Sequence, residues 1–239
     1  MDFLSDIFEY KNGYHVCGLT EELTIQYYLN YYKKTNENIL IVTNTLYDAN
    51  KIFQGLKTYT DNVCLFPMDD FLASVALAIS PDLKVRRLET LERLKGEKCI
   101  VVTNLMGYLR FLPTKSESSK YELNLVKGNT YEREELLNTL NTLGYNRDSL
   151  VTSTGEYAVR GYIIDIFPIE SEHPIRLEFF GDEIDSIRFF NEETQLSINE
   201  VSSFKLMPFS EVSTEQHNSL YEYMNKPFTF FVDENQILN

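Results

Sequence analysis

Short apolar runs alternate with helix-spaced apolar positions over the first half of the chain. Buried strands are predicted at 38–44, 62–67 and 99–104, where most side chains are apolar. Between them, apolar residues recur every three or four positions, a pattern typical of amphipathic helices. A shorter strand is predicted at 15–19, with Thr20 as the N-cap of the helix that follows. Strands of this kind alternating with helices favour a parallel sheet that is covered on both faces.

Two later helices have recognisable limits. One apolar stripe runs from Leu46 to Leu56 at three- and four-residue steps. Another helix is predicted to begin at Ser80 and Pro81, because serine favours the cap and proline the first helical position. Gly96 is well placed to end this second helix.

The pattern changes after a polar, serine-rich link at 114–120. A strand and a helix come next, and strands with period-two alternation follow; the predicted ranges are 121–127, 131–145, 149–153, 156–168, 174–180 and 183–191. Closely spaced strands of this type predict an antiparallel or mixed sheet that carries a helix. The tail adds a predicted helix at 213–224 and an apolar strand at 228–232. That strand fits either an α/β unit cut short or a tail that returns to the first sheet.

These patterns predict an α/β fold in two domains. A parallel-sheet α/β domain is expected at 1–119, a smaller inserted α+β domain with a mixed or antiparallel sheet at 120–207, and a return segment to the first domain at 208–239. A chain of 239 residues is long enough for two modest domains.

One predicted strand carries an aromatic residue at a polar position. In 174–180, apolar side chains take every second position, and Arg176 and Glu178 take positions between them. Phe180 falls in line with these two polar residues, and Arg160 in the preceding strand faces opposite to its apolar neighbour. Single strand arginines are usually solvated, but an exposed ring flanked by arginines has the composition of an interface hot spot. The composition leaves both interpretations open.

The charge balance bears on possible partners. The chain has 22 basic and 36 acidic residues, and its net charge is −14. Non-specific DNA binding by the chain as a whole is disfavoured, because such affinity rests on cations that neutralise phosphates. A local basic patch is not excluded, and one candidate lies on the helix after Pro81, formed by Lys84, Arg86, Arg87 and Arg93. A solvated helix face is the simpler interpretation of that cluster.

Cys17, Cys64 and Cys99 have no metal-type spacing, and each lies in or beside an apolar run. We interpret them as three reduced core thiols in a reducing compartment. The sequence has no N-terminal secretory pattern and no apolar run long enough to span a membrane. A cytoplasmic location is therefore expected.

The place where a phosphate loop would lie has lost most of the residues that such a loop needs. Between the strand at 15–19 and the following helix, only Gly18 supplies a glycine, and Thr24 stands near the position of the missing lysine. Near the other end, Asp233 and Glu234 follow an apolar strand in a Walker B-like arrangement. We expect no ATP binding, no catalysis, no metal site and no cofactor in this chain.

A resemblance to a known family covers nearly the whole chain. The segments GEYAVRGYIIDIFP and HPIRLEFFGDEIDSIRFFN resemble the region shared by the excision-repair protein UvrB and the N-terminal part of bacterial transcription-repair coupling factors (Mfd). CGLTEEL, ILIVTNTLYDANKIFQGL and FPMDDFLASVALAISPDLKVRRLETLERL look like the first half of the coupling-factor region. UvrB has a working phosphate loop and coupling factors a decayed one, so CGLTEELT favours the coupling factors.

The resemblance implies a fold and a partner. The first domain would be a degenerate RecA-like domain without ATP binding, in which Asp233 and Glu234 are relics. The inserted domain would dock onto UvrA, and motif positions assign Arg160, Arg176 and Phe180 to that contact.

The implied function is an adaptor that recruits UvrA to stalled transcription for nucleotide excision repair. In a complete coupling factor, other domains would bind RNA polymerase and translocate DNA with ATP. The alternative is a UvrB-like, ATP-dependent damage-recognition subunit, which would have to bind nucleotide.

Overall fold

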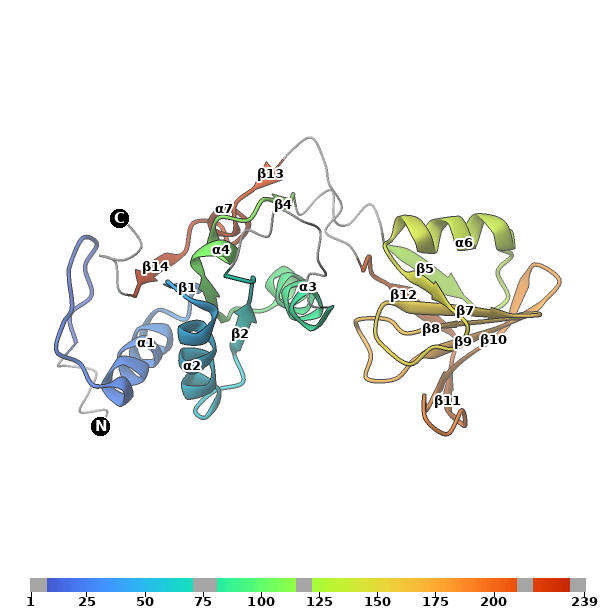
Figure 1. The fold of residues 1–239 in the computed structure, drawn as a ribbon, viewed down its shortest axis with the longest axis horizontal. Helices are drawn as coiled ribbons and strands as arrows, with labels where there is room; N and C mark the ends of the chain where they lie inside the picture. Colours follow the sequence, from blue (N-terminus) through green and yellow to red (C-terminus); the bar gives the residue numbers. More distant parts are fainter. Residues whose placement is uncertain (1–7, 71–80, 115–121, 210–216, 233–239) are drawn as a thin grey trace. The chain divides into compact units, whose positions relative to one another are not determined.

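The computed structural model describes residues 8–70, 81–114, 122–209 and 217–232. The chain divides into two compact units, one formed by residues 1–111 with 218–239 and the other by residues 112–217 (Figure 1). They are called the first and the second unit below. The range predicted for the inserted domain, 120–207, falls within the second unit.

A four-stranded parallel sheet forms the centre of the first unit. Its order is β14-β1-β3-β2, so the tail strand returns to this sheet and lies at its edge. The strands are β1 (Ile39–Thr43), β2 (Val63–Phe66), β3 (Ile100–Asn104) and β14 (Phe228–Phe231). Every residue of β1, β2 and β3 is buried, which is typical of parallel strands covered on both faces. The predicted parallel sheet is confirmed, whereas its RecA-like character stays a prediction.

The long helices of the first unit lie close to their predicted ranges. They are α1 (Glu21–Thr35), α2 (Leu46–Lys57) and α3 (Pro81–Gly96). Two short helices are α4 (Leu105–Tyr108), for which there was no prediction, and α7 (Leu220–Tyr223). The hydroxyl of Thr20 accepts the amide of Leu23 and so caps α1, as predicted. Thr45 caps α2 through the amide of Asp48. Ser80, the expected cap of α3, lies outside the described residues.

α1 and α2 pack on one face of the parallel sheet. Ile39 and Ile41, which alternate along β1, join one core cluster with Leu29 of α1 and Leu56 of α2. Leu40 points to the opposite face and is fully buried as well. Both faces of the sheet are therefore covered, as the apolar runs predict.

The second unit contains a six-stranded mixed sheet in the order β11-β10-β9-β8-β7-β6, in which only β6 and β7 run parallel. A two-stranded sheet, β12-β5, and the helix α6 (Arg133–Thr142) accompany it. The strands are β5 (Leu123–Val126), β6 (Asn146–Asp148), β7 (Glu156–Arg160), β8 (Ile163–Ile166), β9 (Ile175–Phe180), β10 (Glu183–Phe190), β11 (Ser197–Val201) and β12 (Ser203–Leu206). The short strands β4 (Leu112–Pro113) and β13 (His217–Asn218) form another two-stranded sheet.

The six-stranded sheet has an inner face and an outer face. On the inner face, the hydroxyl of Tyr157 donates to Asn141 of α6 at 3.0 Å, and Ile164 pairs with Leu177 in the core. Residues at intervening positions face the other way. The register places the following residues on this outer face: Ala158, Arg160, Ile163, Asp165, Arg176, Glu178, Phe180, Ser186 and Arg188.

Three predicted elements differ from the structure, besides the range 156–168, which forms the two strands β7 and β8. The segment 15–19 is not a strand, because Gly18 adopts a φ of +80° and turns the chain away from an extended path. The segment 149–153 is a turn region in which amides bind the carboxylate of Glu156 in place of a strand partner. Of the helix predicted at 213–224, residues 213–216 lie outside the described residues, and the helix begins only after the cap Ser219.

Candidate protein-docking face

Phe180 ends β9 on the outer face, and its side chain is 85% exposed. Its neighbour Phe179 points to the inner face and is 6% exposed. The two rings differ because successive side chains of a strand point to opposite sides of the sheet. The orientation that the alternation in 174–180 predicts for Phe180 is therefore confirmed. Its contact with a partner stays a prediction.

Arg176 shares the outer face with Phe180, but its guanidinium is largely covered. The side chain is 14% exposed, and it binds both carboxylate oxygens of Asp165, with Nε to Oδ1 at 2.7 Å and a terminal nitrogen to Oδ2 at 2.9 Å. The guanidinium also lies 4.2 Å from the ring centroid of Phe190, a buried residue. Arg176 is thus mainly engaged within its own domain, which differs from the open guanidinium that the sequence suggests.

Arg160 reaches the same carboxylate from β7 and stays more open to water. Its terminal nitrogen lies 2.5 Å from Oδ2 of Asp165, and the side chain is 44% exposed. The amide oxygen of Gln195 also lies within reach of this nitrogen, at 3.5 Å. Of the two arginines, Arg160 therefore has more surface left for a partner.

Asp165 joins the two arginines, and the sequence analysis missed it. The residue is 1% exposed and pairs directly with Arg176 across β8 and β9. Its hydrogen bond raises the pKa of Arg176 and so favours the charged form of the guanidinium. The available signal was one acidic residue inside the apolar run IIDIF, since a buried carboxylate needs a cationic partner.

The other charges of the outer face are paired as well. Arg188 forms an ion pair with Glu178, which also accepts the hydroxyl of Ser186 at 3.0 Å. At the sheet edge, Lys127 binds Glu200 at 2.6 Å. Among the described residues of this face, only the Asp165 cluster has two guanidinium groups for one carboxylate. The outer face therefore combines an exposed ring with a cluster that carries one excess positive charge.

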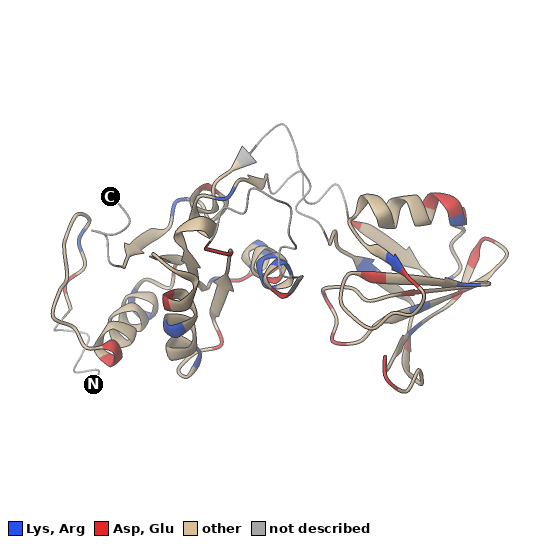
Figure 2. Ribbon diagram, viewed as in Figure 1, with Lys and Arg blue, Asp and Glu red and all other residues tan. Residues whose placement is uncertain are grey.

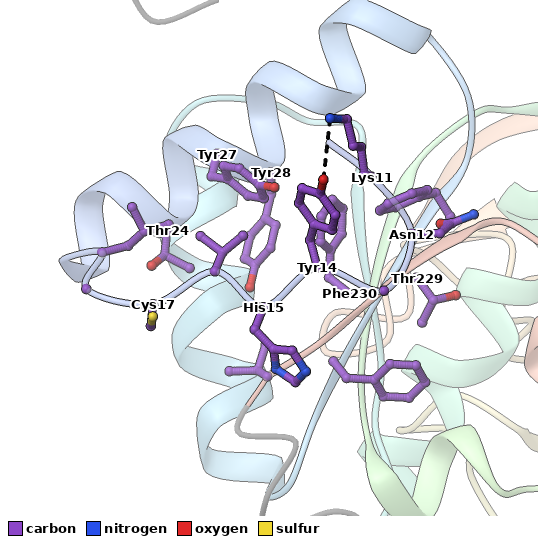
Figure 3. Close-up of a pocket in the computed structure, with 17 residues that line it drawn as sticks. Lys11, Asn12, Tyr14, His15, Cys17, Thr24, Tyr27, Tyr28, Thr229 and Phe230 are labelled. Carbon is purple, nitrogen blue, oxygen red and sulfur yellow. Dashed lines mark hydrogen bonds between the residues drawn. The ribbon is translucent and has the colours of Figure 1, made fainter. Parts of the chain in front are cut away.

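Two of the four residues that the sequence assigns to a decayed nucleotide site line a cavity in the first unit. It has a volume of about 630 Å³ and lies between α1, the edge strand β14 and the segment 11–19 (Figure 3). Gly18 and Thr24 both line it, together with aromatic side chains that include Tyr27 and Phe230. Asp233 and Glu234 lie outside the described residues. The structure therefore brings two of the four predicted residues to one place.

The chemistry of this cavity suits a triphosphate poorly. The ammonium of Lys11, which lines it, donates to the carboxylate of Glu9 and to the hydroxyl of Tyr14, both at 3.4 Å. At the N-terminus of α1, Glu21 places a carboxylate that is paired with Lys51. A working loop would offer a phosphate a free lysine and a row of amides, whereas the lining here has one lysine that is already bound and many aromatic side chains. The expected lack of ATP binding stays a prediction.

The basic cluster of α3 does not form an open patch. Arg87 is 1% exposed and donates to the carbonyl oxygen of Pro67 at 3.0 Å. Arg93 pairs with Glu97 and also contacts backbone carbonyls near β2. Figure 2 shows acidic and basic residues interspersed along the ribbons of both units. The solvated-face interpretation was wrong for Arg87, whereas Arg86 is exposed to solvent.

Other sequence expectations concern metals, thiols and membranes. Within the described ranges, no group of three or more metal-binding side chains is found. Cys64 and Cys99 are buried free thiols, but Cys17 is exposed in the turn region before α1, so its assignment to the core was wrong. Among the helices in the described part of the chain, none is long and apolar enough to cross a bilayer.

Known proteins share much of this sequence. Residues 123–211 match the family described as UvrB interaction domain. The chain is 35% identical over 182 residues to a transcription-repair-coupling factor of Bacillus subtilis (strain 168), covering 75% of this chain and 16% of that protein. It is 33% identical over 205 residues to a transcription-repair-coupling factor of Staphylococcus aureus (strain bovine RF122 / ET3-1), covering 84% and 18%.

The chain thus spans less than one fifth of the length of these relatives. The matched domain comprises most of the second unit, including β7 to β10 and the whole Asp165 cluster. The similarity to the relatives extends well beyond that domain, over three quarters of the chain or more. Taken together, the domain match and the relatives show that the chain belongs to the transcription-repair-coupling factor family, as its N-terminal UvrB-homology region.

Proposed function

We propose that this chain is an adaptor whose second unit binds UvrA, and that it recruits UvrA to stalled transcription complexes for nucleotide excision repair. The observation that carries the proposal is the 85% exposed ring of Phe180, held at the end of a paired strand within the matched UvrB interaction domain. A ring so placed contributes little to its own core. It contributes to binding when a partner removes it from water.

Phe180, Arg160 and Arg176 would have different roles in binding UvrA. Phe180 would fill an apolar recess of UvrA, where a truncated anchor typically costs about 2 kcal/mol or more of binding. Arg160 would meet a carboxylate or carbonyl oxygen of the partner with the exposed edge of its guanidinium. Arg176, which is mostly covered, would act chiefly by keeping the face in shape.

Direct binding tests this proposal. The 239-residue chain is titrated with purified UvrA, and Phe180→Ala is expected to raise the dissociation constant by about tenfold or more. Tyr47→Ala is the matched control, because Tyr47 is a 74% exposed ring on α2 of the first unit. Unchanged affinity in Phe180→Ala, or an equal loss in Tyr47→Ala, would remove this face from the proposal.

The proposal assigns no ATP hydrolysis to this chain. ATP binding is expected to be absent, since the lysine that lines the cavity at Gly18 and Thr24, Lys11, is already bound to Glu9. Contacts to RNA polymerase and DNA would belong to other parts of a longer protein. Calorimetry with ATP and magnesium checks this point. Saturable binding would favour the UvrB-like, ATP-dependent alternative.

A further inference from the structure

We propose that Asp165 and Gln195 are positioning residues, which hold the guanidinium groups of Arg160 and Arg176 together so that the exposed edge of Arg160 has the orientation that UvrA binds. Neither residue is expected to contact UvrA through its own polar atoms. The inference rests on the proposed function, and it adds two residues to which no role in partner binding has been given above.

Gln195 provides the second acceptor of the cluster. Its amide oxygen accepts a terminal nitrogen of Arg176 at 2.9 Å and lies 3.5 Å from that of Arg160. The carboxylate of Asp165 accepts hydrogen bonds from the same two terminal nitrogens, at 2.9 Å from that of Arg176 and 2.5 Å from that of Arg160. Each guanidinium therefore lies between one buried carboxylate and one neutral amide oxygen. Two acceptors on a planar donor fix both its place and the direction of its plane.

The turn that carries Gln195 is itself fixed. Gln195 adopts a φ of +61°, an uncommon backbone conformation for a residue other than glycine. Its side-chain amide donates to the carbonyl oxygen of Glu192 at 2.8 Å, and its backbone amide donates to that of Asn191, also at 2.8 Å. Both polar atoms of the Gln195 side chain thus form hydrogen bonds: the nitrogen donates within the turn, and the oxygen accepts from the arginines. A flexible turn would not present an acceptor so specifically.

The charges of the cluster explain why a neutral second acceptor is suited to this role. Asp165 cancels one of the two guanidinium charges, and Gln195 holds both groups without cancelling the other. The remaining charge lies toward water at Arg160, whose side chain is 44% exposed. Arginines that are already held lose less side-chain entropy on binding. The partner group that this arrangement fits is a carboxylate or carbonyl oxygen beside a recess for Phe180.

The test measures UvrA affinity for variants of the 239-residue chain. Asp165→Asn and Gln195→Ala are each expected to weaken binding by about fivefold or more. Asp61→Asn is the control for the loss of an acidic group, since Asp61 is exposed in the first unit and pairs with Lys57. Gln54→Ala, at an exposed position of α2, is the control for the amide. Both controls are expected to bind as the unaltered chain does.

A double-mutant cycle separates positioning from a general structural role. In an Arg176→Met background, Gln195→Ala is expected to cost less than about twofold, because the guanidinium that it mainly holds is absent. NMR of the free chain gives an independent readout. The Nε–H signal of Arg176 is expected to exchange slowly with water in the unaltered chain and quickly in Asp165→Asn. Gln195→Ala keeps the test usable if Asp165→Asn fails to fold.

The possible outcomes are distinguishable. If the unaltered chain does not bind UvrA, the proposed function fails and this inference fails with it. If the unaltered chain binds and Phe180→Ala weakens binding, while Asp165→Asn and Gln195→Ala bind normally, only this inference is overturned. It is also overturned if Gln195→Ala lowers the unfolding midpoint and weakens binding equally in both backgrounds.

Discussion

At the scale of single residues, Phe179 and Phe180 are neighbours in sequence with opposite surroundings, at 6% and 85% exposure. The first contributes to the core of the second unit, while the second leaves most of its apolar surface in water. Burial is worth about 25 cal/mol for each Å² of apolar surface removed from water. For Phe180 that free energy is unused in the isolated chain. A partner that docks on this face and buries the ring of Phe180 would gain that free energy.

Two alanine substitutions should separate these roles. Phe180→Ala is expected to change the free energy of unfolding by less than about 0.5 kcal/mol, because the ring contributes little to the fold. Phe190→Ala, at a fully buried ring on β10, is expected to cost about 3–5 kcal/mol. Urea unfolding followed by circular dichroism measures both. A comparable loss in the two variants would contradict the assignment of Phe180 to the surface.

The two arginines of the Asp165 cluster should differ in the same measurement. Arg176→Ala removes both direct bonds of a covered guanidinium to a buried carboxylate, and about 2 kcal/mol or more of stability is expected to be lost. Arg160→Ala removes a half-exposed partner and should cost less than about 1 kcal/mol. Equal losses of stability in the two variants would show that the contribution of each arginine does not depend on its exposure. Any loss of UvrA binding in Arg176→Ala must therefore be compared with its stability.

The sequence could predict the ring of this face but not the residue that joins its arginines. Strict alternation in 174–180 places Phe180 outward without knowledge of any other strand. Asp165 follows two adjacent isoleucines, and its face depends on where the chain turns at Gly161 and Tyr162. That turn divides the range 156–168, predicted as one strand, into β7 and β8. Cross-strand pairing, which determines the position of Asp165, is tertiary information.

At the scale of elements, the turn before β7 depends on a close contact between a glycine and an aromatic ring. Gly155 adopts a φ of +87°, and a Cβ added there would lie 2.1 Å from the ring of Phe209. That ring is 4% exposed and packs near Tyr145, with ring centroids 5.8 Å apart. It therefore has little room to move aside. The segment after β12 is thus packed onto the turn before β7.

Substitution of Gly155 tests this packing. Gly155→Ala should lower the free energy of unfolding by about 1–3 kcal/mol more than Gly161→Ala does. Gly161 is the matched control, because it has a φ of +59° and no atom within 4 Å of an added Cβ. Both variants bear the cost of alanine at positive φ, so their difference isolates the contact with Phe209. Equal stabilities would mean that the ring gives way freely.

Long, periodic elements were predicted well and short ones poorly. α1, α2 and α3 combine three- and four-residue periodicity with end signals such as Thr20 and Gly96, and each signal is local. The strands β1, β2 and β3 are apolar over most of their length, which leaves few alternative structures. The segments 15–19 and 149–153 are only five residues long, and their state depends on whether a partner strand is available.

At the scale of the whole molecule, buried tyrosines give the fold a sensitivity to alkaline pH. Burial raises the pKa of Tyr223 from its ordinary value of 10.0 to about 12. Burial also raises the pKa of further tyrosines in both units: Tyr10, Tyr27, Tyr31, Tyr32, Tyr108 and Tyr145. Several of them pack around α1, where Tyr10 and Tyr27 each donate to a backbone carbonyl oxygen.

Stability is expected to fall as the pH rises through this range. A raised folded-state pKa means that the folded chain holds its phenolic protons more tightly than the unfolded chain does. Stability is therefore fully present below about pH 10 and decreases as the pH rises toward 12, by about 1–3 kcal/mol for Tyr223 alone. Urea unfolding at stepped alkaline pH, with tyrosinate absorbance as a second signal, measures the loss. Constant stability over this range would contradict the burial of these hydroxyl groups.

The change of sequence pattern predicted that the molecule has two parts, but it did not predict the residues at which one part ends and the other begins. Alternating strands after a polar link predicted a second domain, yet the units change at 111/112 and 217/218. The short strands β4 and β13 lie at these points, and two-residue strands have no signature in the sequence. The return of the tail to the first sheet is confirmed by the pairing of β14 with β1.

The outward position of Phe180 also limits how the length of β9 can change. Insertion or removal of one residue between Ile175 and Phe180 would exchange the two sides of the strand, turning the ring inward and a core side chain outward. A change of two residues would keep the ring outside and alter only its height on the sheet. Where this face is under selection, the length of the hairpin should therefore vary in even steps.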